Sequence, residues 1–238
     1  EIVKNLPYVD RIVKIDDFTH KELIDKIKYF NSDIFVALYN DSFVSQLARA
    51  SKAKFRIGPL SKLCSFLSYN KGVWQKRSKS IKNEAEYNLD LVKKIDPELF
   101  DKTFEINTSI YLGPENRVAA ATFFSNYNIK DKVLVVNPFM GGSAKNIKDE
   151  QYASLLKEFT LRNPDKSVII VTHISEEERG LNLINMTESN NVHLFANGGD
   201  LLNIGAIIDR GTVYLGPSTG PTHIAGALKK RIVAIYPA

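Results

Sequence analysis

Residues 214–228 read YLGPSTGPTHIAGAL, in which a short apolar strand, a turn rich in glycine and hydroxyl side chains, and a helix follow one another directly. Four further β-branched runs share this half of the chain, near residues 133–136, 168–171, 192–195 and 232–236. Amphipathic stretches separate them, near residues 149–161, 176–188, 201–208 and 221–228. Short strands that alternate with helices of this length predict an α/β fold with a parallel, doubly wound sheet.

The first half of the chain repeats this pattern. We expect strands near residues 11–15, 33–39 and 55–57, and helices near residues 20–30, 42–50 and 84–95. Asp96-Pro97 and Gly113-Pro114 then bracket a polar stretch that precedes a helix near residues 115–127. Because proline disfavours helix in the residue before it, we place a linker in that stretch. The sequence therefore predicts two domains, residues 1–112 and 113–238.

The composition is that of an ordinary globular protein, with 44% apolar and 25% charged residues among 238. It excludes collagen-like and wholly disordered chains, and no apolar run approaches the ~20 residues that span a bilayer. The single cysteine, Cys64, cannot form an intrachain disulfide, so we expect a reducing, cytoplasmic location and no structural metal. Because the first residue is Glu1, we expect the chain to begin inside a longer protein.

The positive charge is concentrated in one segment. Residues 42–83 contain ten Lys and Arg residues and no Asp or Glu, whereas the whole chain has a net charge of only +5. Part of this segment, residues 62–82, has weak periodicity, and we expect a loop or a short helical hairpin there. One basic segment in an otherwise acidic chain indicates a local anionic partner and argues against general binding of nucleic acid.

Open α/β sheets bind ligands in the loops after the carboxyl ends of their strands. In the loop after the strand near residues 133–136, Gly141 and Gly142 allow close backbone approach, Ser143 offers a hydroxyl, and Lys145 is a point charge suited to phosphate. A flexible turn with a surface lysine is the alternative for this loop.

The loop after residues 168–171 is acidic. Ser175 and Glu178 have the spacing of a helix capping box, and structure alone explains such a pair. A carboxylate at the end of a strand can also accept ribose hydroxyls, which gives Glu176 a second possible role. His173 has the character of a polar loop residue.

The loop within residues 214–228 carries hydroxyls at Ser218, Thr219 and Thr222, and His223 lies on the first turn of the helix. Backbone N–H groups at a helix start would face a diphosphate from the positive end of the helix dipole. The alternative is a well-capped connection between strand and helix. Together with the Lys145 loop, this loop favours an anion site in the second domain.

These motifs, in this order, resemble glycosyltransferase family 9, which includes the ADP-heptose lipopolysaccharide heptosyltransferases. The resemblance lies in Asn137-Pro138-x-x-Gly141-Gly142 with Lys145, in residues 175–179 and, most specifically, in Ser218-Thr219-Gly220-Pro221-x-His223-x-Ala225-x-Ala227-Leu228. Residues 6–12 and 56–58 resemble the family's first half, so the likeness covers essentially the whole chain.

The resemblance implies a GT-B fold, with two Rossmann-like domains whose parallel sheets face a cleft. It implies that a nucleotide-sugar donor is bound by Gly141, Gly142, Ser143, Lys145, Glu176, Ser218, Thr219, Gly220 and His223, with Glu176 on the ribose. It also implies metal-independent, inverting transfer with no cofactor, in which an acceptor hydroxyl attacks the anomeric carbon.

The sequence departs from the family at two places. Serine stands at position 218, where the family commonly has an acidic residue. The family's opening strand and the loop with its proposed catalytic base have no counterpart before Glu1, and relatives continue beyond residue 238. We therefore expect a fragment that lacks both ends, and we name no catalytic base.

The resemblance also gives the basic segment an expected partner, an anionic lipopolysaccharide core or lipid A acceptor at the inner face of the cytoplasmic membrane. The docking residues would be Lys71, Trp74, Lys76, Arg77 and Lys79; the alternative is a solvated lysine-rich face. The expected function is transfer of a heptose from ADP-heptose to this acceptor. A nucleotide-sugar epimerase of GT-B type and a non-catalytic nucleotide-sugar-binding module are the alternatives.

Overall fold

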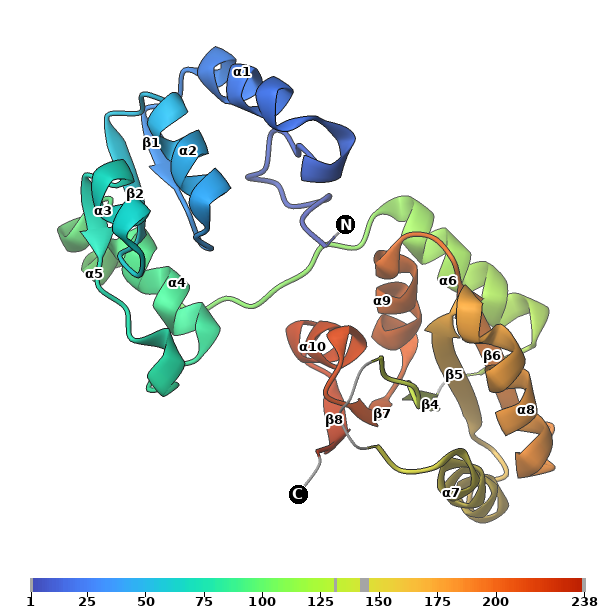
Figure 1. Ribbon diagram of the computed structural model, residues 1–238. Coiled ribbons are helices and arrows are strands. Elements are labelled where there is room, and N and C mark those ends of the chain that lie inside the picture. Colours follow the sequence, from blue (N-terminus) through green and yellow to red (C-terminus); the bar gives the residue numbers. More distant parts are fainter. Residues whose placement is uncertain (1, 131, 142–145, 237–238) are drawn as a thin grey trace. The chain divides into compact units, whose positions relative to one another are not determined.

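The computed structural model describes residues 2–130, 132–141 and 146–236. They form two compact units, one of residues 12–106 and one of residues 2–11 with 107–236 (Figure 1). The sequence predicts a boundary at residue 112 with the first residues in the first domain, whereas the structure divides the chain after residue 106 and groups residues 2–11 with the second unit. In the structure Asn5 Nδ2 donates to the carbonyl of Tyr111, and Lys4 Nζ lies 3.5 Å from both Glu115 and Asp200, which ties the first residues to the second unit.

The second unit is a parallel sheet of five strands in the order β6-β5-β4-β7-β8. The strands are β4 (Val133–Val136), β5 (Ser167–His173), β6 (Val192–Asn197), β7 (Val213–Pro217) and β8 (Arg231–Ile235). The helices are α6 (Pro114–Asn126), α7 (Asp149–Arg162), α8 (Glu177–Thr187), α9 (Leu201–Arg210) and α10 (Gly220–Ala227), with a short 3₁₀ helix, η3 (Ile174–Glu176). This is the doubly wound unit that the sequence predicts.

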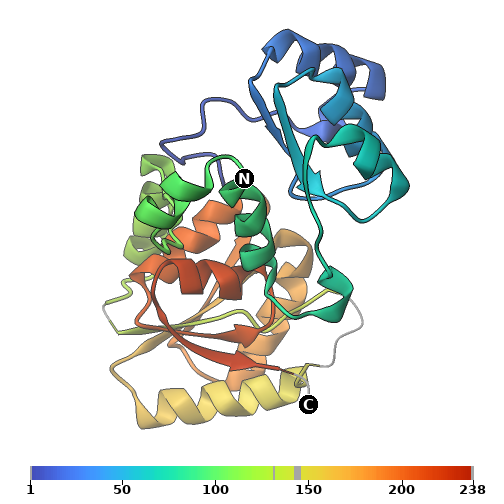
Figure 2. The same ribbon diagram turned by 90° about the vertical axis from the view of Figure 1, so that its left-hand side faces the viewer.

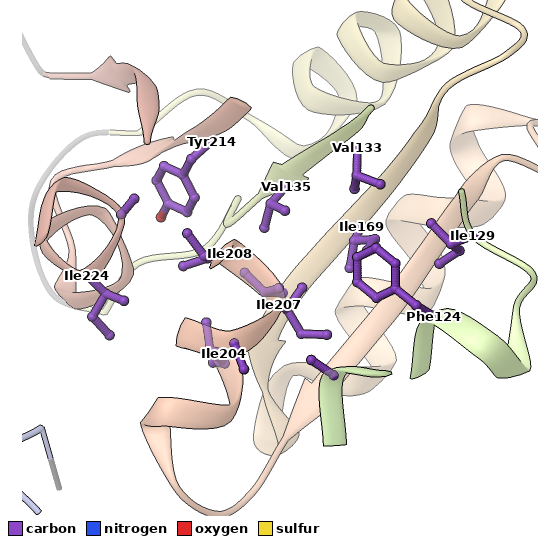
Figure 3. Close-up of a cluster of buried hydrophobic side chains, with 14 residues drawn as sticks. Phe124, Ile129, Val133, Val135, Ile169, Ile204, Ile207, Ile208, Tyr214 and Ile224 are labelled. Carbon is purple, nitrogen blue, oxygen red and sulfur yellow. The ribbon is translucent and has the colours of Figure 1, made fainter. Parts of the chain in front are cut away.

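Alternate residues of the central strands face opposite sides of the sheet. Val133 and Val135 pack with α6, α9 and α10 in one core layer, whose side chains are drawn in Figure 3. Leu134 and Val136 pack with α7 and α8 in the other. Figure 2 shows the two layers from the side, with the yellow α7 on one face of the sheet and the red α10 on the other. Because both faces are covered, β4 reads as a continuous apolar run.

The strand order creates a switch point at β4. From β4 the chain adds β5 and β6 on one side, then returns to add β7 and β8 on the other. Neighbouring connections diverge where the order reverses, so a crevice opens outside the carboxyl ends of β4 and β7. The fold therefore points to the ends of these two strands as the place for a ligand.

The first unit has a parallel sheet in the order β1-β2-β3, made of β1 (Ile34–Val36), β2 (Phe55–Pro59) and β3 (Lys71–Val73). Its helices are η1 (Ile15–Asp17), α1 (His20–Phe30), α2 (Ser42–Ala50), α3 (Leu63–Ser68), η2 (Arg77–Lys79), α4 (Glu84–Lys93) and α5 (Pro97–Thr103). Local capping explains where several of them begin: Thr19 and Glu22 form a capping box for α1, and the Asp41 carboxylate accepts from Val44 N in α2.

Two expectations for the first unit are wrong. Residues 11–15 form no strand, since η1 begins at Ile15. The division between the two units, after residue 106, falls inside the stretch expected to be the linker, and the first part of that stretch forms α5, where Pro97 occupies the first helical position and Asp96 caps the helix. Residues 62–82 are neither a loop nor a helical hairpin, since β3 adds a third strand to the sheet there. Within the described residues no helix is both long and apolar enough to cross a membrane.

Candidate functional site

A cavity of about 430 Å³ opens at the carboxyl edge of the second unit's sheet. Its walls are the loops after β4, β5 and β6 and the start of α10. The described residues that line it are Asn137, Phe139, Met140, Gly141, Thr172, His173, Glu176, Asn197, Gly198, Gly199, Leu201, Ile204, Thr219 and Pro221. The cavity thus lies at the switch point that the strand order defines.

A side-chain hydrogen bond crosses this switch point. Asn137, the residue after β4, is 6% exposed and donates from Nδ2 to Thr219 Oγ1, just after β7, at 2.9 Å. Its backbone N–H donates to the carbonyl of Leu215, which extends the β4–β7 ladder by one bond. Asn137 therefore fixes the spacing of the two loops that form the floor of the cavity.

Buried hydroxyls fix the start of α10. Thr222 Oγ1 donates to the carbonyl of Pro217 at 2.5 Å, and the Tyr214 hydroxyl lies 3.2 Å from Thr222 Oγ1. Burial raises the pKa of Tyr214, so its hydroxyl keeps its proton at neutral pH. Thr219 is the N-cap and Pro221 stands in the first turn. The positive end of the α10 dipole is held in this way beside the cavity.

The loop after β4 is anchored at both described ends. Asn146 Nδ2 donates to the carbonyl of Pro138 at 2.7 Å, and Asn146 Oδ1 accepts from Ile147 N and from the Tyr152 hydroxyl. Burial raises the pKa of Tyr152 to about 12, so this hydroxyl stays a donor. The two ends of the glycine-rich loop are therefore held close together at the cavity.

Glu176 presents a carboxylate to the cavity from the loop after β5. It accepts from Thr172 Oγ1 at 3.3 Å and lies 3.6 Å from Arg179, and its side chain remains 34% exposed. Arg179 makes two 2.8 Å hydrogen bonds to Asp149, and its guanidinium lies over the Phe139 ring. Arg179 therefore pairs mainly with Asp149, and the carboxylate of Glu176 stays partly exposed in the wall of the cavity.

The capping box expected at Ser175 is wrong. The chain after β5 makes the 3₁₀ turn η3 first, and α8 begins only at Glu177. Ser175 N donates to the Nδ1 atom of His173, which caps this turn. The 3₁₀ turn moves the N-cap of α8 from Ser175 to Glu176, a shift of one residue that the spacing of Ser175 and Glu178 does not reveal.

The structure brings three of the predicted donor residues together in the cavity wall: Gly141, Glu176 and Thr219. Ser218, Gly220 and His223 are exposed at the start of α10, outside that wall. Gly142, Ser143 and Lys145 lie outside the described residues. The sequence reasoning missed Asn137 as a bridging residue and the whole Asn197-Gly198-Gly199 loop. Paired glycines directly after a strand were the signal for that loop.

The predicted docking residues lie in and after β3. Trp74 is 65% exposed and its ring lies 5.9 Å from that of Phe66, and Lys76 and Lys79 are exposed as well. Lys71 Nζ lies 3.9 Å from the centre of the Phe55 ring. Arg77 differs from the others because it is held within the unit: its guanidinium donates to Gln75, Glu84 and Asn88.

Comparisons with known proteins agree with this picture. The family model described as glycosyltransferase family 9 (heptosyltransferase) matches residues 21–238. A protein of Haemophilus influenzae that is named as a glycosyltransferase is 28% identical over 97% of this chain and 68% of its own length.

Two solved structures are also similar. A family 9 glycosyltransferase of Veillonella parvula has a TM-score of 0.78 at 17% identity, over 90% of this chain and 61% of that one. ADP-heptose LPS heptosyltransferase II of E. coli has a TM-score of 0.74 at 15% identity, over 97% of this chain and 70% of that one. The chain thus spans about two thirds of the length of these relatives. The fold, two parallel α/β units of GT-B type, is confirmed.

Proposed function

Since the chain belongs to glycosyltransferase family 9, we propose that it serves the transfer of a heptose or a related sugar from a nucleoside diphosphate, ADP-heptose, to a lipopolysaccharide core acceptor with inversion. The observation that carries this proposal is the cavity at the β4–β7 switch point, with the start of α10 on one side and Glu176 on another. A diphosphate needs cationic or N–H donors, and a ribose needs a hydroxyl acceptor; this cavity combines the two.

In this proposal each side of the cavity has a role. Glu176 accepts hydrogen bonds from the ribose hydroxyls. The α10 N-terminus, with Thr219 and His223, and the Lys145 loop hold the diphosphate. As the acceptor hydroxyl attacks the anomeric carbon, the bond to the diphosphate breaks and negative charge grows on the leaving oxygen. Fixed dipoles and a lysine placed before the reaction stabilise that charge without reorganising. We assign no residue of this chain as the base.

Calorimetric titration with ADP, UDP, GDP and CMP tests the donor. We expect ADP to bind most tightly of the four nucleotides. We also expect Lys145→Ala to lower the affinity for ADP by about tenfold, because a hydrogen bond to a charged group contributes ~1.5–3 kcal/mol. Lys148→Ala, which removes an exposed lysine three residues further on, is the matched control and should bind as the wild type does. Preference for UDP would contradict ADP-heptose as donor, and absence of any nucleotide binding would contradict a donor site.

The acceptor proposal rests on the first unit. The segment of residues 42–83 has no acidic residue, and Trp74 and Phe66 place aromatic rings among its lysines. An isomerase needs no such surface, because it has no macromolecular acceptor. We therefore propose that Lys71, Trp74, Lys76 and Lys79 dock an anionic glycolipid at the inner face of the cytoplasmic membrane, where the protein is peripheral, with Arg77 in a supporting role.

Sedimentation with vesicles that contain anionic lipid tests this surface. The double variant Lys76→Glu/Lys79→Glu should bind at least about tenfold more weakly, because each basic residue near an anionic surface contributes ~1 kcal/mol. Arg77 is left unchanged, since its three hydrogen bonds hold the unit together. Lys102→Glu/Lys130→Glu has the same net charge at two other exposed positions and serves as control. Equal binding by the two double variants would refute the docking surface.

A further inference from the structure

The helix α3 of the first unit has its polar and apolar faces reversed. Ser65 and Ser68 are fully buried, whereas Leu63 and Leu67 are 82% and 72% exposed and Phe66 is half exposed. A helix on the surface of a globular protein normally turns its large apolar side chains inward. Residues three and four apart lie on one face of a helix, so Leu63, Phe66 and Leu67 form a continuous apolar surface on the outside of α3.

The buried face of α3 packs without large side chains. The Ser65 hydroxyl donates to the carbonyl of Lys62, and the Ser68 hydroxyl donates to the carbonyl of Cys64 at 2.7 Å, so neither buried oxygen is left unpaired. The helix packs against α2 and β2, and Ser45 Oγ of α2 lies 3.6 Å from Cys64 Sγ. The exposed leucines on the other face therefore contribute little to the stability of this unit.

Trp74 extends the apolar surface of α3. The residue follows β3, its side chain is exposed, and its ring centre lies 5.9 Å from that of Phe66. We call Leu63, Phe66, Leu67 and Trp74 together the α3 patch. Contiguous exposed apolar patches mark sites of interaction with proteins or membranes. Leucine, phenylalanine and tryptophan are also the residues that peripheral proteins bury at the boundary between lipid headgroups and acyl chains.

The charge around the α3 patch favours an anionic partner. Lys62 lies at the start of α3, Lys76 and Lys79 follow β3, and all three side chains are exposed. The basic segment to which they belong contains no acidic residue, and Glu84, just after it, is paired with Arg77. A second copy of the chain would bring the same positive charge against itself, whereas an anionic lipid surface attracts each basic residue near it. An apolar patch flanked by lysines thus matches an anionic bilayer.

We propose that the α3 patch inserts into the interface of a bilayer that contains anionic lipid, with Lys62, Lys76 and Lys79 at the level of the lipid phosphates. The proposal rests on the proposed function, which supplies a membrane-bound acceptor. It goes beyond electrostatic docking of a glycolipid headgroup, because it requires contact between these side chains and the hydrocarbon of the bilayer. An apolar and an electrostatic contribution together anchor a peripheral protein more stably than either does alone.

The fluorescence of Trp74 tests the insertion directly, because this residue is the single tryptophan of the chain. The probes are vesicles of phosphatidylcholine and phosphatidylglycerol, with and without bromine on the acyl chains. Bromine quenches tryptophan only on close approach. We expect vesicle binding to move the emission to shorter wavelength, and the brominated chains to quench it. Vesicles of phosphatidylcholine alone should bind at least about tenfold more weakly, because they lack the negative charge that attracts the three lysines.

Leu63→Ser/Leu67→Ser separates insertion from electrostatic attraction, because it keeps Trp74 and every lysine. We expect this double variant to bind the anionic vesicles at least about tenfold more weakly, since two hydrocarbon side chains are no longer removed from water. Its thermal unfolding should match that of the wild type, because both side chains are exposed. Leu161→Ser/Leu181→Ser makes the same change at two exposed leucines of α7 and α8 and should bind the vesicles as the wild type does.

Three results would overturn the proposal. Binding to vesicles without quenching by brominated chains would show that the lysines alone contact the membrane. Equal vesicle affinity of Leu63→Ser/Leu67→Ser and Leu161→Ser/Leu181→Ser would show that the leucines stay in water. A dimer that forms without lipid, and that Leu63→Ser/Leu67→Ser dissociates in sedimentation velocity, would make a second copy of the chain the partner of the α3 patch.

Calorimetry with ADP separates this proposal from glycosyl transfer. If brominated vesicles quench Trp74 in a protein that binds no nucleotide, insertion is supported and the transfer proposal fails. If ADP binds and the brominated vesicles leave Trp74 unquenched, the donor proposal stands and the insertion proposal fails.

Discussion

Replacing Gly216 with alanine is expected to lower donor affinity by about tenfold, the effect of disrupting one buried hydrogen bond. The added Cβ would lie 2.7 Å from the Tyr214 hydroxyl and 3.0 Å from the carbonyl oxygen of Asn137. The second of these atoms belongs to the backbone, so it can move only if Asn137 moves. Asn137 holds Thr219 across the switch point, and the substitution would therefore separate the two loops that form the cavity floor.

The same substitution should also destabilise the second unit by about 1–3 kcal/mol, the usual cost of overpacking. Thermal unfolding and ADP calorimetry on the same samples measure the two effects. Gly220→Ala is the matched control, because a Cβ there meets no atom within 4 Å. The stability of Gly220→Ala should equal that of the wild type. Any loss of ADP affinity in this variant would then mean that the added methyl group contacts the bound nucleotide at the start of α10. Wild-type ADP affinity in Gly216→Ala would contradict the assigned cavity floor.

Helix boundaries were most predictable where the sequence contains its own capping groups. The helices at residues 20–30 and 42–50 begin and end as predicted, because Thr19 with Glu22 and Asp41 satisfy the first N–H groups locally. The strand at residues 133–136 was equally clear, because a run buried on both faces is apolar throughout. These signals depend only on neighbours in sequence.

Elements that depend on distant partners were not predictable in this way. The three residues of β3 become a strand because β2 offers them an unpaired edge, and their own sequence, Lys-Gly-Val, has little strand character. Residues 11–15 are the opposite case. They contain β-branched residues, but they pair with no strand of the sheet and therefore form no strand themselves. Asp96-Pro97 follows the end of the preceding helix as predicted, since α4 ends at Lys93. That Pro97 also begins α5 was not predictable, because it depends on the hydrogen bond from Leu99 N to Asp96.

In the candidate site, too, the features that depend on neighbours in sequence were predictable and those that depend on distant partners were not. Its loops were predictable because glycines and hydroxyls follow strands, and Gly141, Glu176 and Thr219 do line one cavity. The bond between Asn137 and Thr219 was not predictable, because it requires β4 and β7 to be neighbours although 76 residues separate Val136 from Val213 along the chain. Strand order, which sequence periodicity does not report, decides which loops share a ligand.

Ile207→Ala should be the most destabilising of the proposed variants, with a loss of about 3–4 kcal/mol in the free energy of unfolding. Ile207 is fully buried in α9, in the layer drawn in Figure 3, where it packs with residues of α6, α10 and the central strands. A close-packed layer between a sheet and three helices cannot collapse around the lost atoms, so a cavity remains. Urea unfolding measures the loss, and Ile106→Ala, which removes the same atoms from a side chain 83% exposed, should change stability by less than about 0.5 kcal/mol.

The Ile207→Ala variant also tests whether ADP binds to the second unit. Ile204, one turn before Ile207 on α9, lines the cavity that we propose for the donor, so α9 contributes to both this cavity and the core. If ADP binds the folded second unit, a concentration of one hundred times its dissociation constant should restore about 2.7 kcal/mol of the lost stability. Restoration by ADP and not by CMP would place the nucleotide on the unit that α9 stabilises. A loss in Ile207→Ala no larger than in Ile106→Ala would instead show that this layer is not the stabilising core of the unit.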